Sequence, residues 1–189
     1  MRGPGLFIAI VGPSGVGKDT ILARLKGLLP AEHFVFPMRI ISRVADSNEA
    51  SLFLAAEDFP AARARGEFLI DWEAHGLYYA IPQSMRLEME KGRHVIANLS
   101  RAVLPSLRAA TPRVLVVHVT ARSDILEQRL KVRGREFDAE QQARLARGEA
   151  LDRAVEADIR IENNGAIETA VSALMEALMP LAARERLKA

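Results

Sequence analysis

Residues 6–20 read LFIAIVGPSGVGKDT, a continuous apolar run followed by a glycine-rich turn. An unbroken apolar run is typical of a strand that is covered on both faces of a parallel sheet. The turn has the pattern G-x-x-x-x-G-K, which cradles phosphate groups when it joins a strand to a helix. Apolar residues at helical spacing then follow over 21–29, where Pro30 ends them. The stretch therefore predicts a strand, a phosphate-binding loop and a helix in succession.

The loop has a structural alternative, a glycine-rich turn in which an aspartate caps the next helix. The strand–turn–helix context favours the phosphate-binding interpretation, with backbone N–H groups and the helix N-terminus directed at the anion. Lys18 is expected to reach the β- and γ-phosphates of a nucleotide. The residues expected to bind the nucleotide are Gly12, Pro13, Ser14, Gly15, Val16, Gly17, Lys18, Asp19 and Thr20.

Asp19 stands where the pattern asks for serine or threonine. A carboxylate about 4 Å from a phosphate charge is repelled by roughly 4 kcal/mol at an effective dielectric near 20. A Mg²⁺ ion between the two groups reverses the sign, because magnesium prefers oxygen ligands. We therefore expect Asp19 to be a magnesium ligand, directly or through water; the alternative is a helix N-cap with the metal held elsewhere.

The composition excludes several classes of protein. The chain has 189 residues, 26 basic and 24 acidic side chains, a net charge of +2 and no cysteine. A dedicated nucleic-acid binder would show a basic surplus, and no apolar run approaches the ~18 residues that span a bilayer. The N-terminal segment also lacks the pattern of a signal peptide. We expect a cytoplasmic protein of one domain that acts on small molecules, as a monomer or a homodimer.

Strand and helix patterns alternate along most of the chain, which predicts an α/β fold with a parallel sheet. The interval from about residue 39 to 92 departs from this alternation and indicates an inserted subdomain. We expect strands at 6–11, 34–41 (interrupted by Pro37), 68–81 (a hairpin turning at His75 and Gly76), 94–99, 113–120 and 157–164, and helices at 19–29, 55–66, 84–92, 123–134, 138–157 and 165–183.

Three further motifs carry a resemblance to a known family. RIISR lies at residues 39–43, a D-W…G-x-Y-Y stretch spans 71–79, and arginines 129, 133 and 144 are spaced by four and eleven. With the loop, they resemble the guanylate kinase family of P-loop nucleoside monophosphate kinases. The resemblance implies a single three-layer domain over 1–189. Its core would comprise 1–38, 93–125 and 148–189, its acceptor-binding subdomain about 39–92, and its lid about 126–147.

The same resemblance implies roles for individual residues. Lys18 and the lid arginines Arg129, Arg133 and Arg144 would stabilise the phosphoryl group during its transfer from ATP, and Asn163 would contact the adenine end of the nucleotide. The acceptor would contact residues of the subdomain and of the strand that follows it. These are Arg39, Arg43, Asp71, Tyr79, Asn98, Ser100 and Arg101.

The departures from the family pattern concern the acceptor. Asp46 replaces the second phosphate-gripping arginine, and Asp71 replaces the guanine-reading glutamate. Asn98-Leu99-Ser100 replaces an acidic D-x-D and is followed by Arg101. This combination resembles one branch, the ribose 1,5-bisphosphate phosphokinases of bacterial phosphonate use, which make 5-phosphoribosyl 1-diphosphate from ATP. A substrate with two phosphates and no base suits guanidinium groups, of which Arg39, Arg43 and Arg101 are the best candidates.

Two alternatives belong to different classes. A guanylate kinase, or another kinase of small phosphates, would use GMP or a related acceptor. A non-catalytic guanylate-kinase-like module would bind a partner protein, but such modules typically lack the loop lysine and lid arginines, which are present here. No histidine stands out as a general base, and none is required if the nucleophile is an ionised phosphate oxygen.

Overall fold

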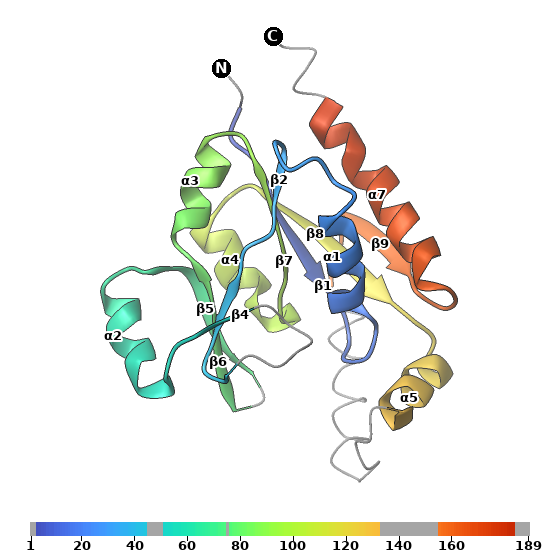
Figure 1. The fold of residues 1–189 in the computed structure, drawn as a ribbon, viewed down its shortest axis with the longest axis horizontal. Helices are drawn as coiled ribbons and strands as arrows, with labels where there is room; N and C mark the ends of the chain where they lie inside the picture. The colour runs from blue at the N-terminus through green and yellow to red at the C-terminus, as the bar shows by residue number, and fades with distance from the viewer. Residues whose placement is uncertain (1–2, 45–50, 75, 133–154, 184–189) are drawn as a thin grey trace.

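A parallel five-stranded sheet forms the centre of the molecule (Figure 1). The structure is a computed structural model that describes residues 3–44, 51–74, 76–132 and 155–183. The strand order is β2-β7-β1-β8-β9, and every pairing between neighbours is parallel. The bounds are β1 Phe7–Val11, β2 Phe34–Val35, β7 His94–Asn98, β8 Val114–Thr120 and β9 Ile159–Glu162.

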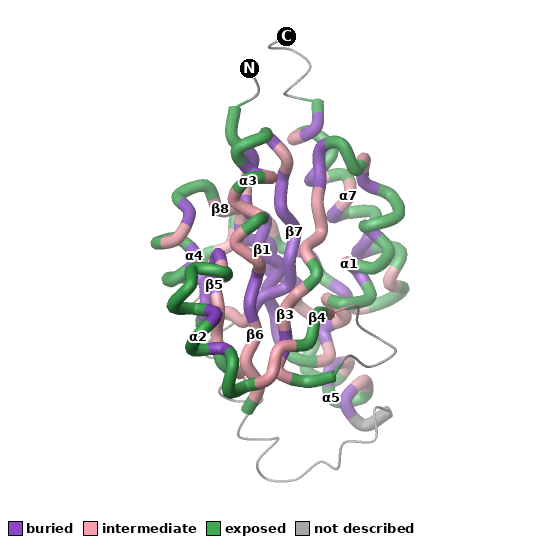
Figure 2. Tube along the Cα trace, turned by 60° about the vertical axis from the view of Figure 1, so that its left-hand side comes forward, coloured by how far each residue is buried: buried purple, intermediate pink, exposed green. Residues whose placement is uncertain are grey.

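Helices cover both faces of this sheet, and the alternation of side chains along β1 divides the core accordingly. Ile8 and Ile10 belong to a cluster with the buried faces of α1 (Lys18–Lys26) and α7 (Ile167–Ala183). Residues 7, 9 and 11 belong to a second cluster with α3 (Ser84–Glu90) and α4 (Leu104–Ala110). All five residues of β1 are fully buried, as Figure 2 shows by colour. The α/β three-layer fold expected from the sequence is confirmed.

The interval that departs from the alternation forms a second, four-stranded sheet of order β4-β3-β6-β5. Its strands are β3 Arg39–Ile41, β4 Ser51–Phe53, β5 Phe68–Ala74 and β6 Leu77–Pro82. The short helices η1 (Ala56–Asp58) and α2 (Phe59–Ala64) precede β5, and α2 packs on one face of this sheet through Phe59. The expected hairpin is present, with β5 and β6 antiparallel.

Pro37 lies between two strands, β2 and β3, that belong to different sheets. The segment before it, β2, pairs with β7 in the large sheet, whereas β3 after it pairs with β4 and β6 in the small one. Proline has no N–H to donate to a ladder, so a change of sheet at this point leaves no broken pairing. The chain thus crosses from the core to the subdomain over three residues.

Some elements were not expected from the sequence, and one lies outside the described residues. The edge strand β4 and the short α4, which follows η2 (Arg101–Val103), carry no clear periodic signal. The expected helix 123–134 is present as α5 (Ser123–Val132). Of the expected helix 138–157, residues 138–154 lie outside the described ranges, and residues 155–157, which are described, are not helical. Among the helices that are described, none has the length and apolar character to cross a membrane.

The closing helix supplies a test of the core. Leu174 is fully buried in the cluster between α7 and the sheet, whereas Met179 on the same helix is 41% exposed. Leu174→Ala should lower the free energy of unfolding by about 2–5 kcal/mol, because it removes buried methyl groups and leaves a cavity. Met179→Ala should change it by about 1 kcal/mol or less. Urea unfolding of both variants checks this, and equal effects would contradict the packing of α7.

Candidate active site

The glycine-rich loop joins β1 to α1 and lies tightly against its neighbours. A Cβ atom on Gly12 would come within 2.2 Å of the carbonyl oxygen of Val119 in β8, so only glycine fits there. Gly17 has φ +93°, and a Cβ atom on it would lie 2.8 Å from Nδ2 of Asn163. The loop is therefore held in one conformation by the ends of two neighbouring strands.

Lys18 folds back over this loop. Its Nζ donates hydrogen bonds to the carbonyl oxygens of Gly12 at 2.8 Å and Pro13 at 2.9 Å. These bonds place the ammonium group at the mouth of the loop, where the sequence pattern puts it beside phosphate. Thr20 and Ser14, the hydroxyl residues of the loop, are both exposed.

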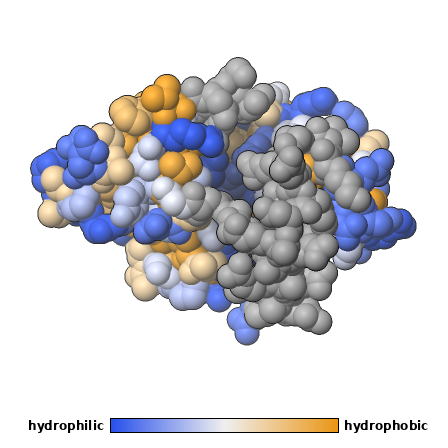
Figure 3. Space-filling view, turned by 90° about the horizontal axis from the view of Figure 1, so that it is seen from below, coloured by the Kyte–Doolittle hydropathy of each residue, from blue (hydrophilic) through white to orange (hydrophobic). Residues whose placement is uncertain are grey.

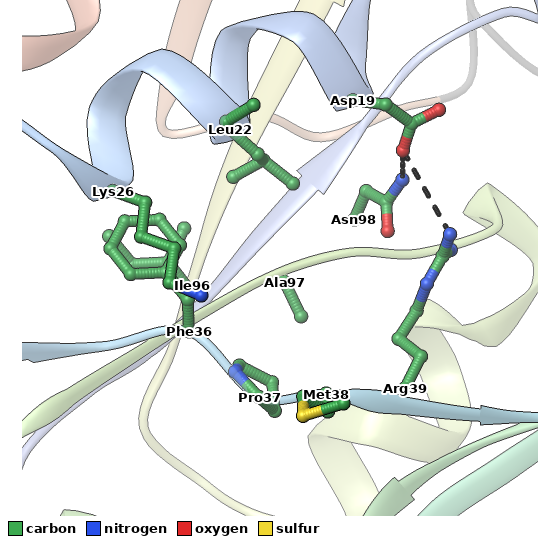
Figure 4. Close-up of a pocket in the computed structure, with 11 residues that line it drawn as sticks. Asp19, Leu22, Lys26, Phe36, Pro37, Met38, Arg39, Ile96, Ala97 and Asn98 are labelled. Atoms are coloured by element: carbon green, nitrogen blue, oxygen red, sulfur yellow. Dashed lines mark hydrogen bonds and ion pairs between the residues drawn. The ribbon is translucent and has the colours of Figure 1, made fainter. Parts of the chain in front are cut away.

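Asp19, in the first turn of α1, lies beside the end of β7, which is the strand next to β1 in the sheet (Figure 4). Its Oδ1 accepts a hydrogen bond from Nδ2 of Asn98 and lies 3.9 Å from Nη2 of Arg39. The Asp19 side chain is 60% exposed, whereas Asn98 is only 6% exposed. The loop carboxylate thus meets one residue of the core strand and one of the subdomain.

Arg39 belongs to a stack of side chains on the subdomain. Its guanidinium carbon lies 5.7 Å from the ring centroid of Tyr79, which is cation–π distance. The Tyr79 ring stacks on Trp72, with centroids 5.4 Å apart and planes inclined by 10°. Arg39, Tyr79 and Trp72 therefore share the face of the small sheet that is directed at the loop.

A pocket of about 300 Å³ opens between α1, the segment before β3 and the end of β7 (Figure 4). One end carries the polar groups of Asp19, Asn98 and Arg39, and the other carries Lys26. Its remaining walls are formed by Leu22, Ala23, Phe36, Pro37, Met38, Ile96 and Ala97. Figure 3 views the molecule from below and shows hydrophilic surface over much of the described part of this side.

Asp71 does not join this cluster. It lies opposite Ala80, whereas Trp72 lies opposite Tyr79, and successive residues of a strand point to opposite faces. The carboxylate of Asp71 accepts hydrogen bonds from Nε and Nη2 of Arg63 on α2, on the other face of the sheet. The hydrogen bond to Asp71, and next its charge, raise the pKa of Arg63 above its ordinary value. Asp71 therefore points to the face opposite Tyr79, and the contact with the acceptor expected for it stays a prediction.

Asn163 holds the glycine-rich loop through a hydrogen bond to its backbone. It follows β9, is 2% exposed, and its Nδ2 donates to the carbonyl oxygen of Val16 at 2.8 Å. Its backbone N–H donates to the carbonyl oxygen of Thr120 at 2.8 Å. The side chain therefore connects β9 to the loop, and its expected contact with adenine stays a prediction.

Of the three lid arginines, the structure describes Arg129. The helix that carries it lies against the loop, since a Cβ atom on Gly15 would lie 3.2 Å from Leu130 Cδ2. Nη1 of Arg129 is buried, and no hydrogen-bond partner for it is found within the described residues. A buried donor without an acceptor is costly, and an oxygen of a bound phosphate is the kind of acceptor that would remove the cost. Arg133, Arg144 and Asp46 lie outside the described residues.

The other expected acceptor residues follow β3 and β7, two strands that contribute residues to the pocket. Ser100 and Arg101 follow β7 at its carboxyl end, and both are half-buried. Arg43 follows β3 and is exposed. The contact between Asn98 and Asp19 was not expected, and neither was the Arg63 pair. Both join residues far apart in sequence or on different elements, so no spacing rule could indicate them.

Comparison with known proteins places these features in a family. The guanylate kinase family model matches residues 6–180, most of the chain. The chain belongs to the guanylate kinase family. Its match includes the loop, the subdomain and the strand end that carries Asn98. The family predicted from the loop, the hairpin motif and the arginine spacing is thus confirmed.

Several relatives are identical to the chain at more than a third of the aligned positions. A ribose 1,5-bisphosphate phosphokinase PhnN of Pseudofrankia inefficax is 40% identical over 180 residues, which cover 95% of this chain and 94% of that protein. The corresponding protein of Bradyrhizobium diazoefficiens is 37% identical over 167 residues, covering 88% and 84%. A bifunctional ribose 1,5-bisphosphokinase-thymidine phosphorylase of Azorhizobium caulinodans is 41% identical, and this chain spans 27% of its length.

Solved structures support the fold alone. A guanylate kinase from Anaplasma phagocytophilum superposes with a TM-score of 0.70 at 19% identity, over 97% of this chain and 88% of that one. An identity of 19% gives no information about the acceptor, whereas the superposition supports the fold described above.

The position of Asn163 gives a prediction about the loop. Asn163→Ala removes its hydrogen bond to Val16 and leaves a carbonyl oxygen buried without a partner, a cost of about 1–3 kcal/mol. The loop should lose its fixed shape, and affinity for ADP should fall roughly 5- to 100-fold at that cost. Isothermal titration of ADP measures this, with the exposed Thr169→Ala on α7 as control. Unchanged affinity would show that the loop keeps its shape without this bond.

Proposed function

We propose that the protein phosphorylates ribose 1,5-bisphosphate with ATP, giving 5-phosphoribosyl 1-diphosphate and ADP. The observation that carries the proposal is the character of the acceptor side of the cleft. It presents the Arg39 guanidinium beside the phosphate loop, while the carboxylate of Asp71 points to the far face and is paired with Arg63. The names of relatives at 37–40% identity agree with this acceptor.

A cationic acceptor side favours a phosphate-rich substrate over a purine. Guanidinium groups bind phosphate through two parallel hydrogen bonds, whereas a purine edge with N–H donors requires carboxylate or other acceptors. Arg39 has a side-chain exposure of 15% and is held on the Tyr79 ring, so its position is largely fixed. Arg43, Ser100 and Arg101 are our further candidates for contacts with the two phosphates.

The nucleotide would bind on the other side of the cleft. Lys18 and the loop N–H groups suit the β- and γ-phosphates, and Arg129 suits the transferred group. The exposed carboxylate of Asp19, with Asn98 beside it, offers the oxygen donors that Mg²⁺ prefers. When bound, the ion would supply neutralisation of the phosphate charge. No cluster of three or more potential metal-binding side chains occurs in the described ranges, which suits a magnesium ion held partly by the substrate and water.

Phosphoryl transfer requires mainly that the attacking oxygen and the γ-phosphate be held in line. An oxygen of the 1-phosphate attacks the γ-phosphorus of ATP, and the bond from that phosphorus to the β-phosphate oxygen breaks. Since the nucleophile is ionised at neutral pH, the residues of the cleft need only hold the two phosphates in line and stabilise the charge. The lid arginines would also exclude water, whose attack on ATP is the competing reaction.

As the wider setting we propose a cytoplasmic enzyme of phosphonate use, which is what the resemblance to the ribose 1,5-bisphosphate phosphokinases implies. The competing function is phosphorylation of GMP, for which the overall fold would serve equally. Family membership favours it, whereas the carboxylate aligned with the guanine reader is paired with Arg63 on the face opposite Tyr79, which argues against it.

A coupled assay tests the acceptor. With ATP and Mg²⁺, ribose 1,5-bisphosphate should support ADP release at a kcat/KM at least 100-fold above that with GMP. The reason is that Arg39 offers a guanidinium group to a phosphate, whereas Asp71, the residue aligned with the guanine reader, is already paired with Arg63. Turnover with GMP alone would refute the proposal.

The role of Arg39 gives a second test. Arg39→Gln should raise the KM for ribose 1,5-bisphosphate by about 10-fold or more, because a hydrogen bond to a charged group contributes about 1.5–3 kcal/mol. The KM for ATP should change much less. Arg65→Gln, an exposed arginine of the same subdomain paired with Glu67, serves as the control. If both variants behave like the wild type, Arg39 does not contact the acceptor.

A further inference from the structure

The carboxylate of Asp19 is held by one oxygen. Oδ1 accepts the hydrogen bond from Asn98 and faces Arg39, while the Oδ2 atom points away from both residues in Figure 4. No interaction of Oδ2 is found among the described residues. The group is thus oriented as a ligand that offers one oxygen to a cation.

The orientation comes from Asn98 more than from Asp19. Asp19 is 60% exposed at the start of α1, where an aspartate alone would sample several rotamers. Asn98 is 6% exposed at the last position of β7, and β7 pairs directly with β1. A buried amide at the end of a central strand has a fixed position, so its N–H group fixes the carboxylate that it contacts.

We propose that Asn98 is a positioning residue for the metal–nucleotide site, which orients Asp19 toward Mg²⁺, and not a contact of the acceptor. The pair then acts as one unit: the amide donates, one carboxylate oxygen accepts, and the other oxygen is directed at the metal. Partners that orient metal ligands in this way are typically worth 10- to 100-fold in metal affinity. The inference rests on the proposed use of a magnesium nucleotide, but not on the identity of the acceptor.

The geometry makes a reciprocal exchange possible, because aspartate and asparagine have the same shape. In Asp19→Asn/Asn98→Asp the hydrogen bond is kept with its direction reversed, and one carboxylate stays within the same pair of side chains. In Asn98→Asp alone two carboxylates face each other, and in Asp19→Asn alone the pair has no charge. A double-mutant cycle over these four proteins therefore isolates the interaction between the two positions.

The experiment measures binding without turnover. Isothermal titration of the full chain with ADP, in the presence and absence of Mg²⁺, gives the metal-dependent gain in affinity. Electron paramagnetic resonance of Mn²⁺ with ADP reports the ion itself. Asp58→Asn, an exposed acid on η1, is the matched control for loss of one negative charge. Melting temperatures show that each variant is folded.

We expect Asp19→Asn and Asn98→Ala each to lower the metal-dependent gain about 10-fold or more, with little change in binding of ADP alone. The double exchange should recover at least a third of the lost affinity relative to Asp19→Asn. A wild-type gain in folded Asn98→Ala, or a double variant no better than Asp19→Asn, would overturn the proposal. Should Asn98→Ala not melt cooperatively, Asn98→Gln, which displaces the donor by one methylene, takes its place with the same expected loss.

This outcome is separable from the acceptor assay. Turnover with GMP alone would refute the proposed acceptor and leave the binding results standing. Conversely, turnover with ribose 1,5-bisphosphate together with unchanged metal binding in the Asn98 variants would overturn only the role given to Asn98.

Discussion

The close approach of the glycine-rich loop to β8 is the constraint on which the site depends. Gly12 has no room for a Cβ atom against the carbonyl oxygen of Val119, so the chain leaves β1 along a single path. That path sets the first turn of α1, and with it Lys18 at the mouth of the loop and Asp19 beside β7. The hydrogen bond from the Asn163 side chain to the carbonyl oxygen of Val16 further fixes the loop. A fixed loop binds phosphate with little further loss of backbone entropy.

The two faces of the small sheet carry different kinds of side chain. One face carries Arg39, Tyr79 and Trp72 toward the loop, and the other is covered by α2, with Phe59 against Tyr78 and Arg63 against Asp71. Pairing Asp71 with Arg63 neutralises a carboxylate that would otherwise repel an anionic acceptor at close range. Among the described residues of the subdomain, Arg39 is the charged side chain that lines the pocket.

The sequence predicted the fold well, whereas the side-chain contacts of the site depend on strand register and strand order. Continuous apolar runs identified β1, β7 and β8, and helical spacing identified α1, α3 and α7, because buried elements carry strong periodic signals. The hairpin was also predicted; within it Asp71 pairs with Ala80 and Trp72 with Tyr79, so Asp71 and Tyr79 point to opposite faces of the small sheet. A shift of one residue reverses the face of every side chain in a strand. The Asp19–Asn98 contact joins positions 79 residues apart, a proximity that only the strand order reveals.

The charges of the cleft explain why the reaction needs so few acidic groups. Lys18 and Arg39 lie at the loop, Arg101 follows β7, and Arg129 belongs to the helix against Gly15. Asp19 is the carboxylate among them, and its charge is partly shared with Arg39 at 3.9 Å. A phosphate acceptor arrives already ionised, so no base has to remove a proton before transfer. In the proposed reaction the site must overcome repulsion between two anionic substrates, and these cationic side chains would lower that repulsion before either substrate reacts.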